Sequence, residues 1–109
     1  MDNNDETETK IIGKYFLSIS EAFESKIRMA IIAGLFSGDK DWSDLKALTG
    51  TSDGNLSTHL AKLESIDYIY VNKKFLKKRP NTTYCLTSKA IREFTEYVNM
   101  LVGLINIKH

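Results

Sequence analysis

The stretch TSDGNLSTHLAKLE, residues 51–64, has the pattern of a helix with two unequal sides. Leu56, Leu60 and Leu63 recur at the spacing of one helical face, which predicts a buried apolar stripe. The opposite side carries small or polar groups, namely Gly54, Thr58, Ala61 and Ser65, flanked by Asn55, Ser57 and Lys62. A helix with so little bulk on its outer side leaves room for another molecule to approach closely.

A shorter helix is predicted just before this one, in the run SDLKALTG. Ser43 is a suitable N-cap for it, and Gly50 is a suitable end. Ser52, or the threonine before it, can then cap the longer helix, so the two helices are joined by the tight link TGTS. Such a pair indicates a helix-turn-helix over about residues 43–66, with residues 52–66 as the candidate recognition helix.

The outer side of the candidate recognition helix suits the major groove of DNA, which admits a helix whose outward side chains are short or are themselves the contacts. Asn55 carries the amide that pairs with adenine, and the hydroxyls of Ser57 and Thr58 are able to reach bases or phosphates. Gly54 lets the backbone approach closely. The residues expected to contact the major groove are Ser52, Gly54, Asn55, Ser57, Thr58 and Lys62. The alternative is an ordinary solvated face with a loose helix start.

A basic β-hairpin is predicted after the recognition helix. YIYVNKKF alternates in polarity and TTYCL has β-forming residues, while the segment between them holds the only proline. The expected hairpin covers about residues 68–86, and its cations are Lys73, Lys74, Lys77, Lys78 and Arg79. A basic hairpin in this position can reach the neighbouring minor groove or backbone, with Lys73, Lys77, Lys78 and Arg79 as its expected contacts. The alternative is a solvated loop.

The distribution of charge agrees with a polyanionic partner. The chain of 109 residues has a net charge of only +1, but residues 55–92 hold eight Lys or Arg against two Asp or Glu. A near-neutral chain with such a basic middle presents a basic surface, which is typical of nucleic-acid binding. The chain length suits one domain, predicted over residues 11–109 after a disordered acidic segment at residues 1–10.

The two ends of the chain carry more apolar surface than one small core can cover. Residues 11–37 are helical in pattern, as one helix or as two with a break near Ser18–Ser20, and a long helix is expected over about residues 88–107. Exposed apolar faces of this size mark interfaces, so a homodimer is predicted. Its expected interface residues are Ile12, Tyr15, Phe16, Ile19, Phe94, Val98, Leu101, Val102 and Ile105. The alternative is packing of the two terminal helices on each other within one chain.

The runs DWSDLKALTGTSDGNLSTHLAKLESIDYIYV and KKRPNTTYCLTSKAIREFTEYV resemble small winged-helix transcription regulators of the MarR and ArsR types. The resemblance covers about residues 20–102, and it implies a mainly α fold with a β-hairpin wing, namely a winged helix-turn-helix whose long terminal helices dimerise. It further implies a homodimer that binds a pseudo-palindromic double-stranded DNA site and regulates transcription. A winged-helix module for protein interaction or assembly is the alternative, and an enzyme is not expected.

Two departures from the family pattern limit what is carried over. Asp67 stands where such domains commonly have glycine, and aspartate tolerates the left-handed conformation that this position needs. The cysteine cluster of ArsR-type metal sensors is absent, so no metal site and no cofactor are expected, while a small-molecule effector stays open. Cys85 is expected to act as a small buried hydrophobe, and His59 as a partly buried packing residue.

The location of the protein is expected to be cytoplasmic. The N-terminus MDNNDETETK lacks the basic and apolar regions of a signal peptide, and no run of eighteen apolar residues exists. A single cysteine excludes an internal disulfide.

Overall fold

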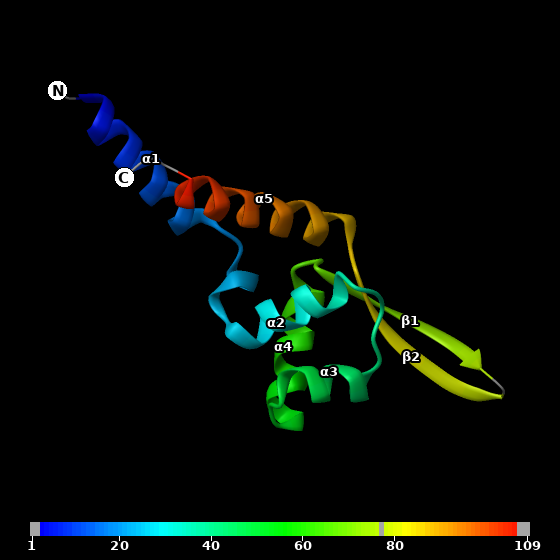
Figure 1. Cartoon of the computed structure of the whole chain (residues 1–109). Coiled ribbons are helices and arrows are strands. Elements are labelled where there is room, and N and C mark those ends of the chain that lie inside the picture. The colour runs from blue at the N-terminus through cyan, green and yellow to red at the C-terminus, as the bar shows by residue number, and fades with distance from the viewer. Residues whose placement is uncertain (1–2, 77, 107–109) are drawn as a thin grey trace.

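The computed structural model describes residues 3–76 and 78–106 of the chain, and its elements follow the predicted order. They are α1 (Asn3–Ser18), the 3-10 helix η1 (Glu21–Glu24), α2 (Lys26–Leu35), α3 (Trp42–Thr49), α4 (Asp53–Ser65), β1 (Ile69–Leu76), β2 (Arg79–Leu86) and α5 (Ser88–Ile105). This arrangement confirms the predicted mainly helical fold with a β-hairpin (Figure 1). In the described part of the chain, no helix is long and apolar enough to cross a bilayer.

The molecule is elongated, with extents of 68 × 24 × 23 Å. Its radius of gyration is 17.5 Å, whereas a compact domain of this length has a radius of about 13 Å. Figure 1 shows the reason: α1 and the β-hairpin extend from opposite sides of a compact middle. The single chain therefore leaves α1 largely without a partner.

The N-terminal segment differs from the prediction, because residues 3–10 belong to α1 and not to a disordered tail. Once the first turns of a helix exist, each further residue adds a hydrogen bond at little cost, so a polar extension needs no burial. Residues 11–37 do not form one helix: α1 ends at Ser18 and α2 begins at Lys26, with η1 between them. Ser20 caps η1 and Ser25 caps α2, each by accepting a backbone N–H two or three residues ahead.

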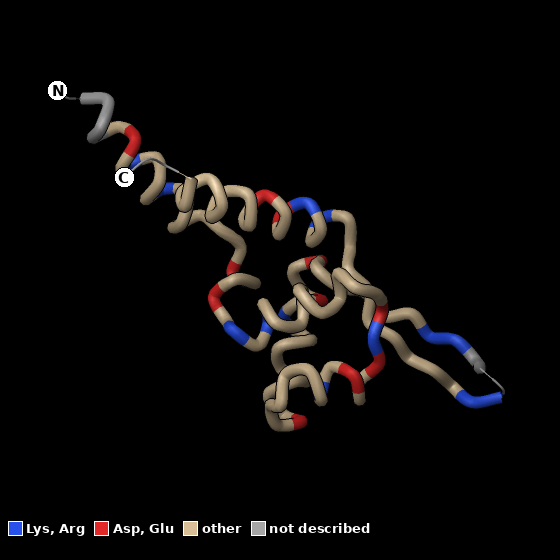
Figure 2. The backbone as a smooth tube through the Cα atoms, viewed as in Figure 1, with Lys and Arg blue, Asp and Glu red and all other residues tan. Residues whose placement is uncertain are grey.

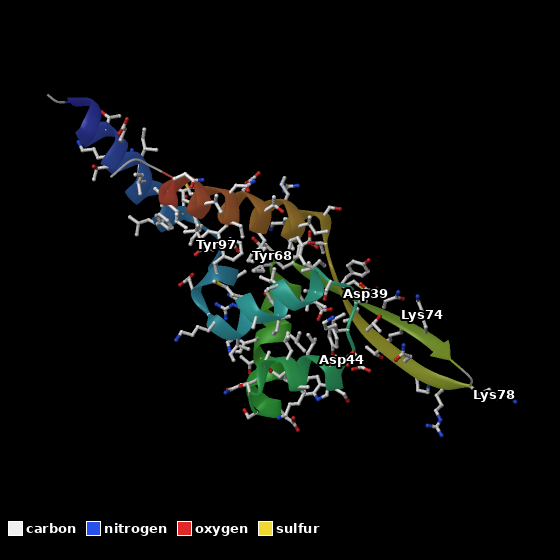
Figure 3. The ribbon with its side chains drawn as sticks, in the orientation of Figure 1. Asp39, Asp44, Tyr68, Lys74, Lys78 and Tyr97 are labelled. Atoms are coloured by element: carbon white, nitrogen blue, oxygen red, sulfur yellow. The ribbon has the colours of Figure 1, made fainter. Side chains whose placement is uncertain are left out.

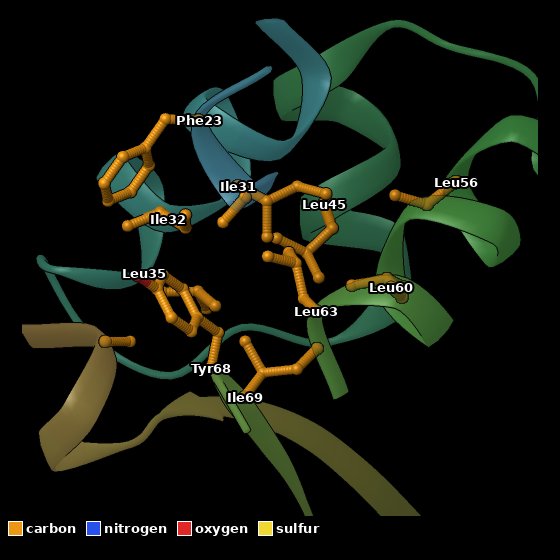
Figure 4. Packing of buried hydrophobic residues seen from close by; sticks show 12 residues of the cluster. Phe23, Ile31, Ile32, Leu35, Leu45, Leu56, Leu60, Leu63, Tyr68 and Ile69 are labelled. Atoms are coloured by element: carbon orange, nitrogen blue, oxygen red, sulfur yellow. The ribbon is translucent and has the colours of Figure 1, made fainter. Parts of the chain in front are cut away.

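The core lies where α2, α3 and α4 meet the first residues of β1 (Figure 4). The predicted stripe of Leu56, Leu60 and Leu63 is buried, with at most 5% of each residue exposed. Its partners are Ile31, Ile32 and Leu35 from α2, Leu45 from α3, and Tyr68 and Ile69. Burying a leucine stabilises a fold by roughly 2 kcal/mol. The stripe therefore holds α4 firmly, although the helix begins with the poor helix formers Asp-Gly.

Helix α3 begins two residues earlier than predicted. Asp41, and not Ser43, is its N-cap, and Asp41 and Asp44 each accept the other's backbone N–H in a capping box. Such reciprocal capping satisfies two free donors at the helix start. The loop before α3 also pairs with the hairpin: Lys40 and Tyr84 exchange backbone hydrogen bonds of 3.2 and 2.7 Å. The hairpin is thus tied to the helix-turn-helix at its base.

The passage from α4 to β1 follows the prediction made for Asp67. Its φ angle is +62°, in the left-handed region, and its carbonyl accepts a hydrogen bond from the Thr87 hydroxyl at 2.6 Å. Thr87 also caps α5 by accepting the N–H of Ala90. The turn at Asp67 therefore connects α4 to β1 and is hydrogen-bonded to the N-cap of α5.

Candidate nucleic-acid interface

The turn between α3 and α4 sets the start of the recognition helix. Gly50 ends α3 in a left-handed conformation, with φ +62°, and its N–H donates to the Lys46 carbonyl at 2.9 Å. Ser52 then caps α4 by accepting the N–H of Asn55 at 3.2 Å. The Ser52 hydroxyl therefore accepts one hydrogen bond as a cap and keeps its O–H donor for another partner.

The two sides of α4 are as unequal as the sequence predicts. The leucine stripe is buried, whereas the opposite residues are exposed: Gly54, Asn55, Ser57, Thr58, Ala61 and Ser65. A Cβ atom placed on Gly54 would meet nothing within 4 Å. The glycine is therefore not required by packing, and the space above it is open for a ligand.

The polar side chains of this outward face differ in how many of their hydrogen-bonding groups are already used within the chain. The Thr58 hydroxyl donates to the Gly54 carbonyl at 2.9 Å, so it presents lone pairs and a methyl group outward. Among the described residues, the side chains of Asn55 and Ser57 make no hydrogen bond. These two residues keep both donors and acceptors free for bases or phosphates.

Both lysines beside the recognition helix are held by carboxylates. The Lys46 Nζ atom of α3 lies 2.8 Å from Asp53 Oδ1, at the first residue of α4. The Lys62 Nζ atom lies 2.8 Å from Glu21 Oε1 of η1. Lys62 was expected in the major groove, but here its amine is directed to η1, since the carboxylate there offers it an ion pair.

His59 is half-buried and has a specific partner, as predicted. Its Nδ1 atom lies 3.1 Å from Nη1 of Arg28, a residue of α2. Burial, together with the nearby Arg28 charge, holds the pKa of His59 below its ordinary value. Both effects disfavour the charged imidazole, so His59 is neutral at neutral pH.

The β-hairpin is the basic wing that the sequence predicts (Figure 2). β1 and β2 pair antiparallel, in a register that runs from Ile69 opposite Leu86 to Leu76 opposite Arg79. Lys78 occupies the turn between the strands with φ +67°, and Lys73, Lys74 and Arg79 are exposed near it. Figure 3 places Lys78 at the far end of the wing, away from the helical body. Lys77, also predicted to bind DNA, lies outside the described residues.

Cys85 lies in β2 and is 2% exposed. Burial, and to a lesser degree the neighbouring Asp39, raises the pKa of its thiol. A buried, protonated thiol is unreactive, which agrees with the predicted role of a small hydrophobe. In the part of the chain that the structure describes, no three His, Cys, Asp or Glu side chains gather into a metal-binding group.

The residues predicted for a dimer interface divide into two sets. Phe94 packs against the rings of Phe23 and Phe36, and Ile19 packs on the same core, so both are used within the chain. Next to this packed face, α5 carries an exposed apolar stripe, which comprises Ile91, Val98, Val102 and Ile105. On α1, Ile12, Tyr15 and Phe16 are half-buried, whereas Ile11 and Leu17 are 60% and 90% exposed. Leu101 is half-buried.

A cleft of about 460 Å³ lies where the end of α1 approaches the start of α5. Tyr15, Ile19 and Phe23 form its apolar part, and Arg92 and Glu96 are among its charged residues. Tyr15 and Glu96 are close enough that burial and this carboxylate together raise the pKa of the Tyr15 hydroxyl. No pattern in the sequence indicates this cleft, because it joins residues about 70 positions apart.

Sequence reasoning missed the polar residues that hold α4 in place. Lys46 and Arg28 come from other helices, and nothing in their spacing pairs them with Asp53 and His59. Only the Lys46–Asp53 pair had a signal in the sequence: Lys46 lies one turn before the end of α3, and the tight turn brings that end close to the start of α4.

Comparison with known proteins agrees with this geometry. A family described as a winged helix DNA-binding domain matches residues 27–105. The uncharacterized protein MJ0432 of Methanocaldococcus jannaschii is 31% identical over 83 residues, which is 75% of this chain and 90% of the relative.

Solved structures share the fold at low sequence identity. A transcriptional regulator homologue from Pyrococcus horikoshii superposes with a TM-score of 0.73 at 21% identity, covering 85% of this chain and 92% of that one. A protein described as a MarR-family transcriptional regulator, from Enterococcus faecalis, gives 0.69 at 15% identity, covering 94% and 86%. At these identities the likeness concerns the fold alone.

Proposed function

We propose that this protein, which belongs to the family of winged helix DNA-binding domains and is a DNA-binding regulator of transcription, acts as a homodimer on a specific duplex site. In this proposal α4 enters the major groove, and the wing lies along the flanking backbone or in the minor groove. The family is one of DNA-binding domains and not of enzymes.

The observation that carries the proposal is the outward face of α4. It has open space above Gly54 and free polar side chains at Asn55 and Ser57, directly beside a helix start held by the Ser52 cap. A groove-binding helix needs this combination of clearance, rigid placement and unused hydrogen-bonding groups. Thr58 adds a methyl group and an acceptor to the same face. Lys62 is assigned to the brace with Glu21 and not to the groove.

The wing supplies a second contact of a different kind. Lys73, Lys74, Lys78 and Arg79 are exposed and make no ion pair among the described residues, so they are free for phosphates. Lys77 is proposed to act with them on the basis of the sequence. Contacts to phosphate add affinity and salt dependence but little sequence choice.

The proposed dimer uses the apolar surface that one chain leaves exposed. The stripe on α5 is exposed, and so are Ile11 and Leu17 of α1; exposed apolar surface of this kind marks an interface. A two-fold axis through these helices would place two copies of α4 about one DNA turn apart, roughly 34 Å. A cytoplasmic location and a small-molecule effector remain predictions that accompany this proposal.

Selection of bound duplexes from a random pool tests the proposal. At low salt we expect enrichment of one sequence with two related half-sites about ten base pairs apart, and the affinity of that duplex should fall steeply as salt rises. Enrichment of a single unrepeated site would contradict the dimer. No enrichment at any salt concentration would contradict specific DNA binding and would favour a protein-interaction module.

A further inference from the structure

Arg28 links the recognition helix to the segment between α1 and α2. Its Nη1 atom lies 3.1 Å from His59 Nδ1 on α4, and its Nη2 atom donates to the Glu21 carbonyl of η1 at 2.6 Å. Its buried Nε atom finds no hydrogen-bond partner among the described residues. The guanidinium is therefore satisfied mainly through these two contacts, and losing either one would leave a half-buried cation poorly solvated.

A second link lies one turn further along α4. The Glu21 carboxylate accepts from Lys62 at 2.8 Å, so the same residue of η1 binds α4 through its side chain and holds Arg28 through its backbone. Glu21 also lines the cleft between α1 and α5. The two links thus join the DNA-facing helix to the base of the terminal helices.

The chemistry of the Arg28–His59 contact fixes the state of the imidazole. A guanidinium has only N–H donors and keeps its proton throughout the physiological range, so His59 Nδ1 must accept. An accepting Nδ1 requires the neutral ring with its proton on Nε2. Protonation of His59 would place an N–H against the N–H of Arg28, with two positive charges 3.1 Å apart.

We propose that Arg28, Glu21 and His59 are positioning residues, which fix the recognition helix against η1 only while His59 is neutral, so that specific DNA binding weakens as the protein takes up this proton. The inference rests on the proposed function, because it assumes that α4 enters the DNA. The charged group in contact with His59 is the Arg28 guanidinium of α2, while the Glu21 carboxylate of η1 and the Lys62 ammonium of α4 pair with each other. Of the side-chain types at these two contacts, histidine is the one whose ordinary pKa, about 6.5, falls between about pH 5.5 and 8.

The sign follows from the lowered pKa of His59, which has burial as its main cause and Arg28 as its second. The linked state resists protonation, whereas a released His59 has an ordinary pKa of about 6.5. The link is therefore fully favoured above about pH 6.5 and is weakened as the pH falls below that value. At pH 5.5 the released state gains up to about tenfold relative to pH 7.5.

The test measures the affinity of the selected duplex at fixed salt between about pH 5.5 and 8, for the wild type and for His59→Asn. The Oδ1 atom of asparagine stands where Nδ1 stands in histidine, so it can accept from Arg28 without titrating. We expect the wild type to lose up to about tenfold in affinity on acidification, and the variant to lose much less. His109→Asn removes the only other histidine of the chain and should leave the wild-type profile unchanged.

Arg28→Lys provides a second variant, because a lysine cannot reach both partners with two donors. It should also flatten the pH profile while circular dichroism reports a retained fold. If the wild type and His59→Asn have the same profile, or if acidification tightens wild-type binding, the inference is wrong. Tighter binding would indicate that His59 contacts phosphate directly. A wild type that selects no duplex at any pH would instead contradict the proposed function.

Discussion

The recognition helix and the wing differ in how their charges are held. Beside α4, Lys46 and Lys62 each lie 2.8 Å from a carboxylate, so the helix presents little free charge. On the wing, Lys74, Lys78 and Arg79 are exposed and unpaired among the described residues, and Figure 3 shows Lys74 and Lys78 along the hairpin. One surface is nearly neutral, and the other is basic and extended.

This difference separates selectivity from affinity. Free cations release counterions from any duplex, so the wing should bind all sequences alike. A braced helix with little charge gains only where its hydrogen-bonding groups match the base edges. If this division is correct, changes on α4 should alter which duplex is bound, and changes on the wing should alter how strongly every duplex is bound.

The largest expected effect is that of Gly54→Leu. The helix should accept the change, because a side chain there meets nothing within 4 Å and leucine is a better helix former than glycine by about 0.8 kcal/mol. The added bulk would hold α4 away from the groove floor. We expect thermal stability to be retained or slightly raised, and the preference for the selected duplex over random DNA, on the order of 10³-fold or more, to be lost.

Gly103→Leu is the matched control for this change. Gly103 also lies in a helix and is exposed, and a Cβ atom placed on it would meet nothing within 4 Å. On α5 it falls on the polar side with Arg92 and Glu96, away from the exposed apolar stripe. Its replacement should leave DNA preference unchanged. Specific binding that survives Gly54→Leu would show that this face of α4 does not enter DNA.

The features that the sequence predicted well are those with a local cause. The leucine stripe, the tight turn at Gly50 and the alternating wing strands each depend on residues a few positions apart. The left-handed Asp67 was also foreseen, because the passage from helix to strand demands that conformation. Sequence reasoning therefore placed helix α4 and the two strands of the hairpin correctly.

The features that it missed depend on long-range packing. The packing of Phe94 on Phe23 and Phe36 is one example, since periodicity shows that a face is apolar but not which neighbour covers it. The ion pair of Lys62 with Glu21, a residue far earlier in the chain, was also not readable from the sequence. The pairing of Arg28 with His59 has the same origin. Such contacts follow from how helices cross, which one sequence alone does not encode in a readable pattern.

A smaller effect on selectivity is expected from Asn55→Ala. The amide of Asn55 is exposed and unused within the described chain, so its removal should leave the fold intact. We expect discrimination at one base pair of each half-site to fall by about 1–3 kcal/mol, with binding to random DNA unchanged. Repeating the duplex selection would reveal the relaxed position. Ser65→Ala, at the far end of the same helix, is the control and should keep the original preference.

The smallest effect on selectivity is expected from the wing pair Lys78→Gln and Arg79→Gln. Both side chains are exposed, so thermal stability should not change. The affinity should fall for selected and random duplexes alike, and the slope of log affinity against log salt should become flatter by about 4 for the dimer, since two wings lose two phosphate contacts each and each contact contributes about 0.9. Lys10→Gln with Lys14→Gln removes the same charge from exposed positions on α1 and should leave the slope unchanged. A loss confined to the selected duplex would mean that the wing reads bases, and the division of labour between helix and wing would not hold.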